Sequence, residues 1–275
     1  MAEQGVAAMR LEAEESFRRG DLQGCLRSLQ ASVRQSPADA KLRIFLAQVL
    51  MVLGDWDRAL NQLKVIGELD AGALPMVGAY GAAIQCERLR AEVFAGRRSP
   101  LLFGEPVPWI ALLMQSLALQ GEGRTSEAGQ VRAEAFEIAP AVSGTLNGEP
   151  FEWIADADSR LGPVLEVLLN EAYYWIPFER IASVVVEPPS DARDLVWLPA
   201  EFRWTNGGEA MGLIPSRYPG SELSDDPAIR MARRTEWREA GPDAYVGLGQ
   251  RVLTTDGPEL GLLELRELRL GSTAA

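Results

Sequence analysis

A pattern that occurs twice, 34 residues apart, constrains the fold of this chain more than any other feature. Gly20-Asp21 recurs as Gly54-Asp55. Small residues recur in step with these pairs: Ala13 and Ala47, and Cys25 and Ala59. Apolar residues around them are spaced three and four positions apart, as on one face of a helix. The pattern predicts two helix–turn–helix units, with small residues where the paired helices approach closely and Gly-Asp at each turn.

A third unit of the same kind lies further along the chain. Residues 109–120 predict its first helix, 121–123 its turn and 125–139 its second helix. Before it, residues 76–95 predict a single helix whose expected partner is replaced by a loop rich in glycine and proline. A helical pair that repeats every 34 residues resembles the tetratricopeptide repeat, whose units stack because no unit buries its own apolar face. We therefore expect a short helical solenoid with a concave surface.

Short strand patterns replace the helical period after residue 141. Residues 164–169 form an apolar run of strand length, and Asn206-Gly207 joins two short segments as a hairpin turn would. The other expected elements are strands at 148–154, 181–186, 202–205, 210–214, 251–255 and 260–268, and a short helix at 226–234. No long linker separates the halves. We predict an α+β fold in which a tetratricopeptide-like helical repeat domain, residues 1–141, packs on a strand-rich domain, residues 142–275.

The composition excludes several classes of function. The formal net charge is −12, which disfavours nucleic-acid binding because Lys and Arg must neutralise the phosphates. The chain has no histidine, so it contains no Ser-His-Asp triad, no Cys-His pair and no imidazole ligand for a metal. The nearest glycine pattern, at 246–249, lacks the remaining features of nucleotide-binding motifs. We expect no enzymatic activity, no cofactor and no bound metal.

The sequence also predicts a cytoplasmic protein without a membrane partner. No apolar run reaches the roughly 18 residues that a membrane span requires. The N-terminus lacks the basic and apolar regions of a signal peptide. Cys25 and Cys86 lie in helical patterns and are expected to be buried thiols in a reducing compartment, with a disulfide as the alternative.

The first helix of each unit lines the concave side of a tetratricopeptide-like solenoid. The register places there Ile44, Phe45, Gln48, Met51 and Val52 from the second unit, and Ile110, Leu113, Met114 and Leu117 from the last. This largely apolar lining suits an amphipathic helix of a partner protein. Two interpretations stay open, because the second domain of the same chain could fill the concave surface instead.

One cluster of charged residues could carry chemistry: Asp156, Asp158, Arg160 and Glu166. Its carboxylates could hold a divalent cation and serve a carboxylate- or metal-dependent enzyme. They could equally form a turn with local hydrogen bonds and an Arg–carboxylate pair, and Arg193-Asp194 could pair with a Glu or Asp of this cluster. The run lacks the further oxygen ligands of a calcium loop, so we favour the structural interpretation. The enzyme remains an alternative, as does a purely structural scaffold.

A string of motifs in the second half resembles a known family. Asp158-Ser-Arg160-Leu-Gly162-Pro-Val-Leu-Glu166 is followed by Tyr174-Trp175-Ile-Pro177-Phe178 and by Arg193-Asp194-Leu-Val-Trp197. Behind a tetratricopeptide-like first half, these motifs resemble the ImpE/SciE family, the TagJ-type accessory proteins of type VI secretion. The resemblance covers essentially the whole chain. We interpret the motif residues as structural, because large aromatics are also ordinary core of a small sheet.

The resemblance implies a function that the residues alone do not. Members of this family are non-enzymatic cytoplasmic components that bind the N-terminal helix of the sheath subunit TssB. They are linked, directly or indirectly, to ClpV, the ATPase that disassembles contracted sheaths. For this chain the resemblance therefore implies an adaptor between sheath and ATPase, and a helix ligand agrees with the apolar lining.

Overall fold

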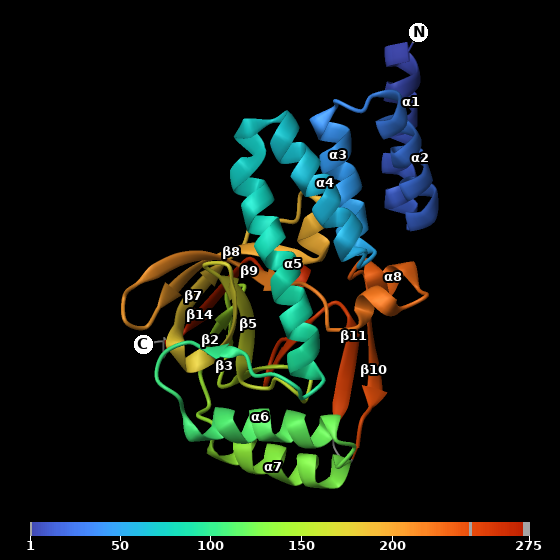
Figure 1. Cartoon of the computed structure of the whole chain (residues 1–275). Helices are drawn as coiled ribbons and strands as arrows, with labels where there is room; N and C mark the ends of the chain where they lie inside the picture. The colour runs from blue at the N-terminus through green and yellow to red at the C-terminus, as the bar shows by residue number, and fades with distance from the viewer. Residues whose placement is uncertain (1, 242–243, 272–275) are drawn as a thin grey trace.

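The computed structural model describes residues 2–241 and 244–271, with the backbone alone for residues 2–7. Helices fill the first half of the chain and strands dominate the second, which confirms the predicted fold class (Figure 1). The helices of the first half are α1 (Ala2–Arg19), α2 (Leu22–Gln35), α3 (Ala40–Val52), α4 (Trp56–Leu69), α5 (Leu74–Phe94), α6 (Pro108–Gly121) and α7 (Thr125–Ile138). Within the described ranges no helix is long and apolar enough to cross a membrane.

Glycine turns join the paired helices where the repeat predicts them. Gly20 and Gly54 have left-handed backbone, with φ of +83° and +72°. Their N–H groups donate to the carbonyls of Phe17 and Met51, both at 3.0 Å, and so close the last turns of α1 and α3. The repeated small residues Ala13, Ala47, Cys25 and Ala59 are all fully buried, as the predicted close approach requires. Cys25 and Cys86 are buried free thiols.

The regular stacking of helix pairs ends after α5. Gly96 ends this helix in left-handed conformation, and a Cβ there would lie 2.6 Å from the Leu117 carbonyl oxygen of α6. The following segment contains β1 (Leu101–Leu102), which pairs in parallel with β6 (Ala172–Pro177). The predicted loop thus joins the sheet. This detour places the α6–α7 hairpin on the opposite side of the molecule from α1–α4 (Figure 1).

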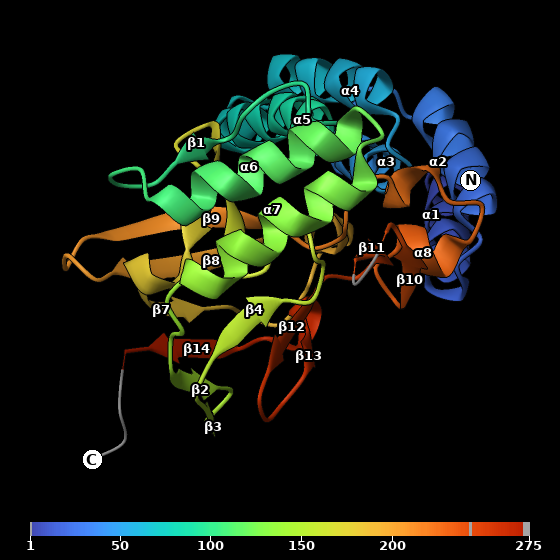
Figure 2. The same ribbon diagram turned by 90° about the horizontal axis from the view of Figure 1, so that it is seen from below.

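A nine-stranded sheet forms the centre of the second half, in the order β1-β6-β5-β9-β8-β7-β14-β2-β3. Its other strands are β2 (Gly144–Leu146), β3 (Glu149–Phe151), β5 (Val164–Leu169), β7 (Ile181–Val185), β8 (Trp197–Trp204), β9 (Glu209–Pro215) and β14 (Glu267–Leu270). Both faces of β5 are buried, since Val164 and Leu168 join a core shared with the helices while Leu165 and Val167 join a second core. Helices α5, α6 and α7 lie along one side of the sheet (Figure 2).

Two smaller elements and one short helix complete the fold. They are a sheet of β13 (Leu260–Gly261), β12 (Val252–Thr255) and β4 (Ile154–Asp156), a hairpin of β10 (Thr235–Glu239) and β11 (Tyr245–Gly249), and α8 (Pro227–Arg230). The hairpin of β8 and β9 turns at Asn206-Gly207, as predicted, with φ of +85° at Gly207.

Three predicted elements have different limits in the structure. The expected strand at 148–154 is divided between β3 and β4, because the Asp256 carboxylate accepts the N–H groups of Glu152 and Trp153 between them. The expected strand at 260–268 is likewise split, since a 3₁₀ turn over Leu262–Glu264 carries the chain from the small sheet to the large one. The expected helix at 226–234 ends at Arg230, shortly before Ala232 with φ of +51°.

Trp197 of β8 holds the helical and strand-rich parts together. Its indole is stacked with Trp56 of α4 at 6.0 Å and with Tyr80 of α5 at 6.4 Å between ring centroids. Its Nε1 donates to Glu87 of α5 at 2.9 Å. Because one core includes residues of both parts, the two predicted domains are packed together rather than connected by a linker.

Candidate functional site

A groove of about 610 Å³ lies between α1, α3 and residues 189–195. Three residues of the predicted concave lining, Ile44, Phe45 and Gln48, open into it. Lys41 lies on the same face of α3, because positions i, i+3, i+4 and i+7 of a helix share one side. The second repeat unit therefore presents one face of its first helix to the groove, while the rest of α3 is buried.

The floor of the groove is apolar. Phe17 of α1 meets Phe45 edge-on, with ring centroids 5.9 Å apart and planes at 73°. Ile44 and Leu195 extend this surface, and all four side chains are only partly buried. Partly buried aromatic and aliphatic side chains in a concave site are the usual anchors of a protein interface.

The far wall of the groove is held in place by Asp194, one of the family-motif residues. Its carboxylate accepts the backbone N–H groups of Ser190 at 2.8 Å and Asp191 at 2.9 Å, and the Nε of Arg193 at 2.7 Å. The Ser216 hydroxyl donates to the Asp194 carbonyl at 2.6 Å. These bonds fix the 3₁₀ turn over Ala192–Leu195, so the wall is preorganised without a ligand.

The remaining predicted residues of the second unit do not reach the groove. Met51 and Val52 are fully buried, and their carbonyls accept hydrogen bonds from the guanidinium of Arg217 at 3.0 and 2.7 Å. Arg217 thus satisfies backbone groups left open at the end of α3. For these two residues the open-surface interpretation is wrong, and the segment that covers them comes from the strand-rich part.

The interpretation that residues of the last unit line an open concave surface is also wrong. Ile110, Leu113 and Leu117 of α6 are buried, and Met114 packs against the same core. That core also contains Val164 and Trp175 of the sheet, so the strand-rich part covers this face of α6. Because the chain detours after α5, the second and last units do not share one concave surface (Figure 1).

The carboxylates of the predicted charged cluster all form ion pairs with arginines. Asp158 pairs with Arg160 at 2.6 Å, as the structural interpretation expected. Asp156 pairs with Arg251 at 2.7 Å and Glu166 with Arg90 at 2.6 Å, and these four side chains are fully buried. No group of three or more potential metal-binding side chains lies together among the described residues.

Glu166 lies at the centre of this buried cluster. Arg90 donates to its two oxygens from Nε and Nη2, at 2.6 and 2.8 Å, and the Tyr173 hydroxyl donates at 2.6 Å. Burial by itself would raise the pKa of Glu166, but Arg90 and Arg251 outweigh it and lower this pKa to about 2. Burial raises the pKa of Asp156 to about 6 against the attraction of Arg251. We call Arg90, Asp156, Glu166, Tyr173 and Arg251 the ionic junction.

The other family-motif residues are placed by packing. Gly162 has φ of +54°, and a Cβ there would lie 2.4 Å from the Phe136 ring. Trp175 and Pro177 are buried, with Trp175 donating from Nε1 to the Tyr173 hydroxyl at 2.7 Å, while Tyr174 packs edge-on to Phe103. The expected contact between Arg193 and the carboxylate cluster is not present in the described structure, since Arg193 pairs with Asp191 and Asp194.

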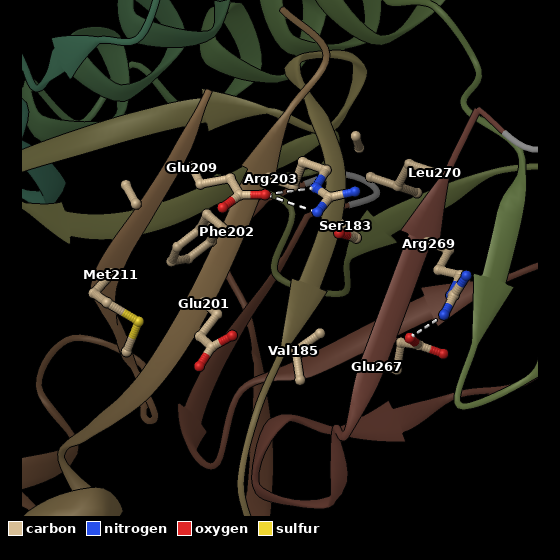
Figure 3. Close-up of a pocket in the computed structure, with 12 residues that line it drawn as sticks. Ser183, Val185, Glu201, Phe202, Arg203, Glu209, Met211, Glu267, Arg269 and Leu270 are labelled. Carbon is tan, nitrogen blue, oxygen red and sulfur yellow. Dashed lines mark hydrogen bonds and ion pairs between the residues drawn. The ribbon is translucent and has the colours of Figure 1, made fainter. Parts of the chain in front are cut away.

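A second hollow, of about 780 Å³, lies on the outer face of β9, β8, β7 and β14 (Figure 3). Its arginines already have partners on the same face: Arg203 pairs with Glu209 and Arg269 with Glu267, both at 2.7 Å. Two apolar side chains are also exposed on this face, Met211 at 63% and Val185 at 39%. An antiparallel sheet commonly keeps one polar face in water, so this hollow needs no ligand to explain it.

Some groove residues were missed at the sequence level. Lys41 shares the helical spacing of Ile44 and Phe45, so the pattern itself could have identified it. Phe17 and Leu195 belong to other segments, and only the packing of those segments against α3 shows that they form one site.

Comparisons with known proteins agree with this architecture. Residues 148–269 match the model of the ImpE protein family, and residues 16–79 match a tetratricopeptide repeat model. The chain is 52% identical over 272 residues to the type VI secretion system accessory component TagJ of Pseudomonas aeruginosa, covering 99% of this chain and 95% of that protein. A crystal structure of a Vibrio parahaemolyticus protein has the same fold, with a TM-score of 0.86 at 23% identity over 95% of this chain and 98% of that one.

Proposed function

The chain belongs to the ImpE family of type VI secretion accessory proteins that includes TagJ, and from this premise we propose that it is a non-enzymatic, cytoplasmic adaptor of a bacterial type VI secretion system. Its proposed partner is the N-terminal helix of the sheath subunit TssB. By holding that helix it would link the sheath, directly or indirectly, to the disassembly ATPase ClpV.

The groove between α1, α3 and residues 189–195 is the surface that we assign to this helix. One observation carries the assignment: the apolar floor of this groove is not covered by any part of the described chain. The floor lies between the face of α3 that carries Ile44 and Phe45 and the preorganised wall at residues 189–195. A helix laid in such a groove buries its own apolar face. Burial contributes about 25 cal/mol per Å² before the cost of ordering the partners is subtracted.

The alternative function, a carboxylate- or metal-dependent enzyme, has less support from the structure than the adaptor has. The carboxylate oxygens of Asp156, Asp158 and Glu166 accept hydrogen bonds from arginine and tyrosine side chains, and most of these side chains are buried. The measured likeness to an accessory component also favours an interaction protein.

Calorimetric titration with a TssB helix peptide tests the assignment. We expect saturable binding by the wild-type protein, with the negative heat-capacity change of apolar burial. Phe45→Asp should weaken binding by about 30-fold or more, because it places a charge at the centre of the apolar floor.

Met211→Asp is the matched control, since it changes an exposed apolar side chain on the outer sheet face. It should bind like the wild type. Equal binding by a folded Phe45→Asp protein would contradict the groove assignment, and weaker binding by Met211→Asp would move the site to the sheet. Phe45→Ala provides a milder second variant if the aspartate disturbs folding.

A further inference from the structure

The hairpin of β10 and β11 forms a small sheet of its own (Figure 1). Among the described residues no further strand pairs with β10, and its side chains after Thr235 are exposed, Trp237 at 40%. An isolated two-stranded hairpin is only marginally stable in water, so this one needs support from the rest of the fold. Tyr218 supplies it on one face, with its ring centroid 5.5 Å from that of Trp237. The outer edge of β10 has no such support.

The backbone groups of every second residue of β10 point away from β11. Just beyond the last pair of the ladder, the N–H of Ala240 donates to the Ala244 carbonyl at 2.8 Å. Hydrogen-bonded pairs alternate along an antiparallel ladder, so this bond fixes which residues of β10 face β11. The residues that turn their N–H and C=O groups to the open edge are Thr235, Trp237 and Glu239. Such an edge can pair with a strand of another molecule.

Two side chains of opposite charge lie between these open positions. Glu236 and Arg238 are two residues apart, so they lie on the same face of the strand. Arg238 has no carboxylate within ion-pair distance in the described chain. Glu236 pairs with Arg234, which has a second partner in Asp226 at 3.0 Å. Charged side chains usually protect an edge strand from pairing, but with one charge of each sign the effect depends on the register.

Only one symmetric register of two β10 strands brings the opposite charges together. When a two-fold axis passes beside Trp237, Glu236 lies opposite the partner's Arg238 on both sides of the axis. The outward N–H and C=O groups of Trp237 then face those of the partner, as hydrogen bonding requires. An axis beside Glu236 or beside Arg238 would place like charges directly opposite each other, which is destabilising. The strand therefore favours one pairing with a copy of itself and opposes the neighbouring ones.

We propose that the open edge of β10 pairs with the same edge of a second copy of this chain, so that two hairpins form one antiparallel sheet centred on Trp237. This interaction surface lies outside the groove and does not depend on the proposed function. One short strand from each copy buries less area than a stable dimer needs, so the dimer should be weak and form in the micromolar range or above. Pairing would also relieve the marginal stability of the isolated hairpin.

Charge reversal provides a test in which two defective variants restore each other. Glu236→Arg leaves two arginines in each β10 strand, and Arg238→Glu leaves two glutamates. Each variant alone places like charges opposite each other, so its dimer should be about tenfold weaker than that of the wild type. An equal mixture of the two variants should form a dimer of wild-type affinity, because every arginine then faces a glutamate. Sedimentation equilibrium at increasing protein concentration measures all three affinities.

The chain offers matched controls for both reversals. Glu68 of α4 and Arg27 of α2 are exposed, so Glu68→Arg and Arg27→Glu make the same changes in net charge on other elements. Both controls should associate like the wild type, alone and mixed.

A wild-type protein that stays monomeric to its solubility limit would overturn the proposal. So would a dimer that resists both reversals, one that the controls weaken equally, or two β10 variants that fail to associate when mixed. No TssB peptide is used in these measurements, so their failure would leave the proposed function standing.

Discussion

The ionic junction and the groove use charged and polar side chains in opposite ways. At the junction, Glu166 is buried and accepts hydrogen bonds from Arg90 and Tyr173. In the groove, the Gln48 amide is reached by water and makes no hydrogen bond with the described residues, and exposed Lys41 has no carboxylate within ion-pair distance in the described chain. A saturated cluster fixes how the helical and strand-rich parts meet, whereas an unsaturated one remains available to a second molecule.

Removal of one charge from the junction should have the largest effect. Glu166→Gln leaves Arg90 and Arg251 without their shared carboxylate in a buried site, so the free energy of unfolding should fall by about 3–5 kcal/mol. Denaturant unfolding measures this loss. Glu267→Gln, which breaks an exposed pair with Arg269, should change stability by less than about 0.5 kcal/mol. Equal losses in the free energy of unfolding would contradict this prediction, because the junction would then contribute no more to stability than an exposed ion pair.

The pH dependence of stability should report the same carboxylate. The pKa of Glu166 is lowered from 4.5 to about 2 in the folded protein. Its contribution to stability is therefore present above pH 4.5 and is lost as the pH falls toward 2. Since each pKa unit corresponds to about 1.4 kcal/mol, the stability difference between wild type and Glu166→Gln should shrink by about 3 kcal/mol over this range. A difference that stays constant with pH would contradict the assigned ion pair.

Loosening of the groove wall should have a smaller effect on stability. Asp194→Ala removes the acceptor for two backbone N–H groups and for Arg193, which should cost about 1–3 kcal/mol. Because the wall would no longer be preorganised, peptide affinity should fall roughly threefold. Asp57→Ala, which breaks an exposed pair with Arg88 on the helical repeats, serves as control for both readouts. Unchanged affinity in Asp194→Ala would exclude the 189–195 segment from the site.

The sequence predicts those parts of the molecule whose signals are local. Gly20 and Gly54 mark turns because only a left-handed residue closes these helix ends, and Asn206-Gly207 marks a hairpin for a similar reason. The α3 face of the groove, with Ile44, Phe45 and Gln48, follows from helical spacing alone.

The parts that could not be predicted depend on contacts between distant segments. Glu166 meets Arg90 from 76 positions away, and Asp156 meets Arg251 from 95 positions away, so no local pattern identifies these partners. The burial of Leu113 has the same origin. The detour through β1 turns α6 away from the repeat path, and the face expected to be open becomes core.

Hydrogen–deuterium exchange of the protein, alone and with a saturating TssB helix peptide, tests the central claim most directly. The account predicts that the peptide slows exchange in α1, α3 and residues 189–195, while the ionic junction and the outer face of β7, β8 and β9 exchange as before. Protection confined to the outer sheet face or to α6 and α7, with α1 and α3 unchanged, would contradict it.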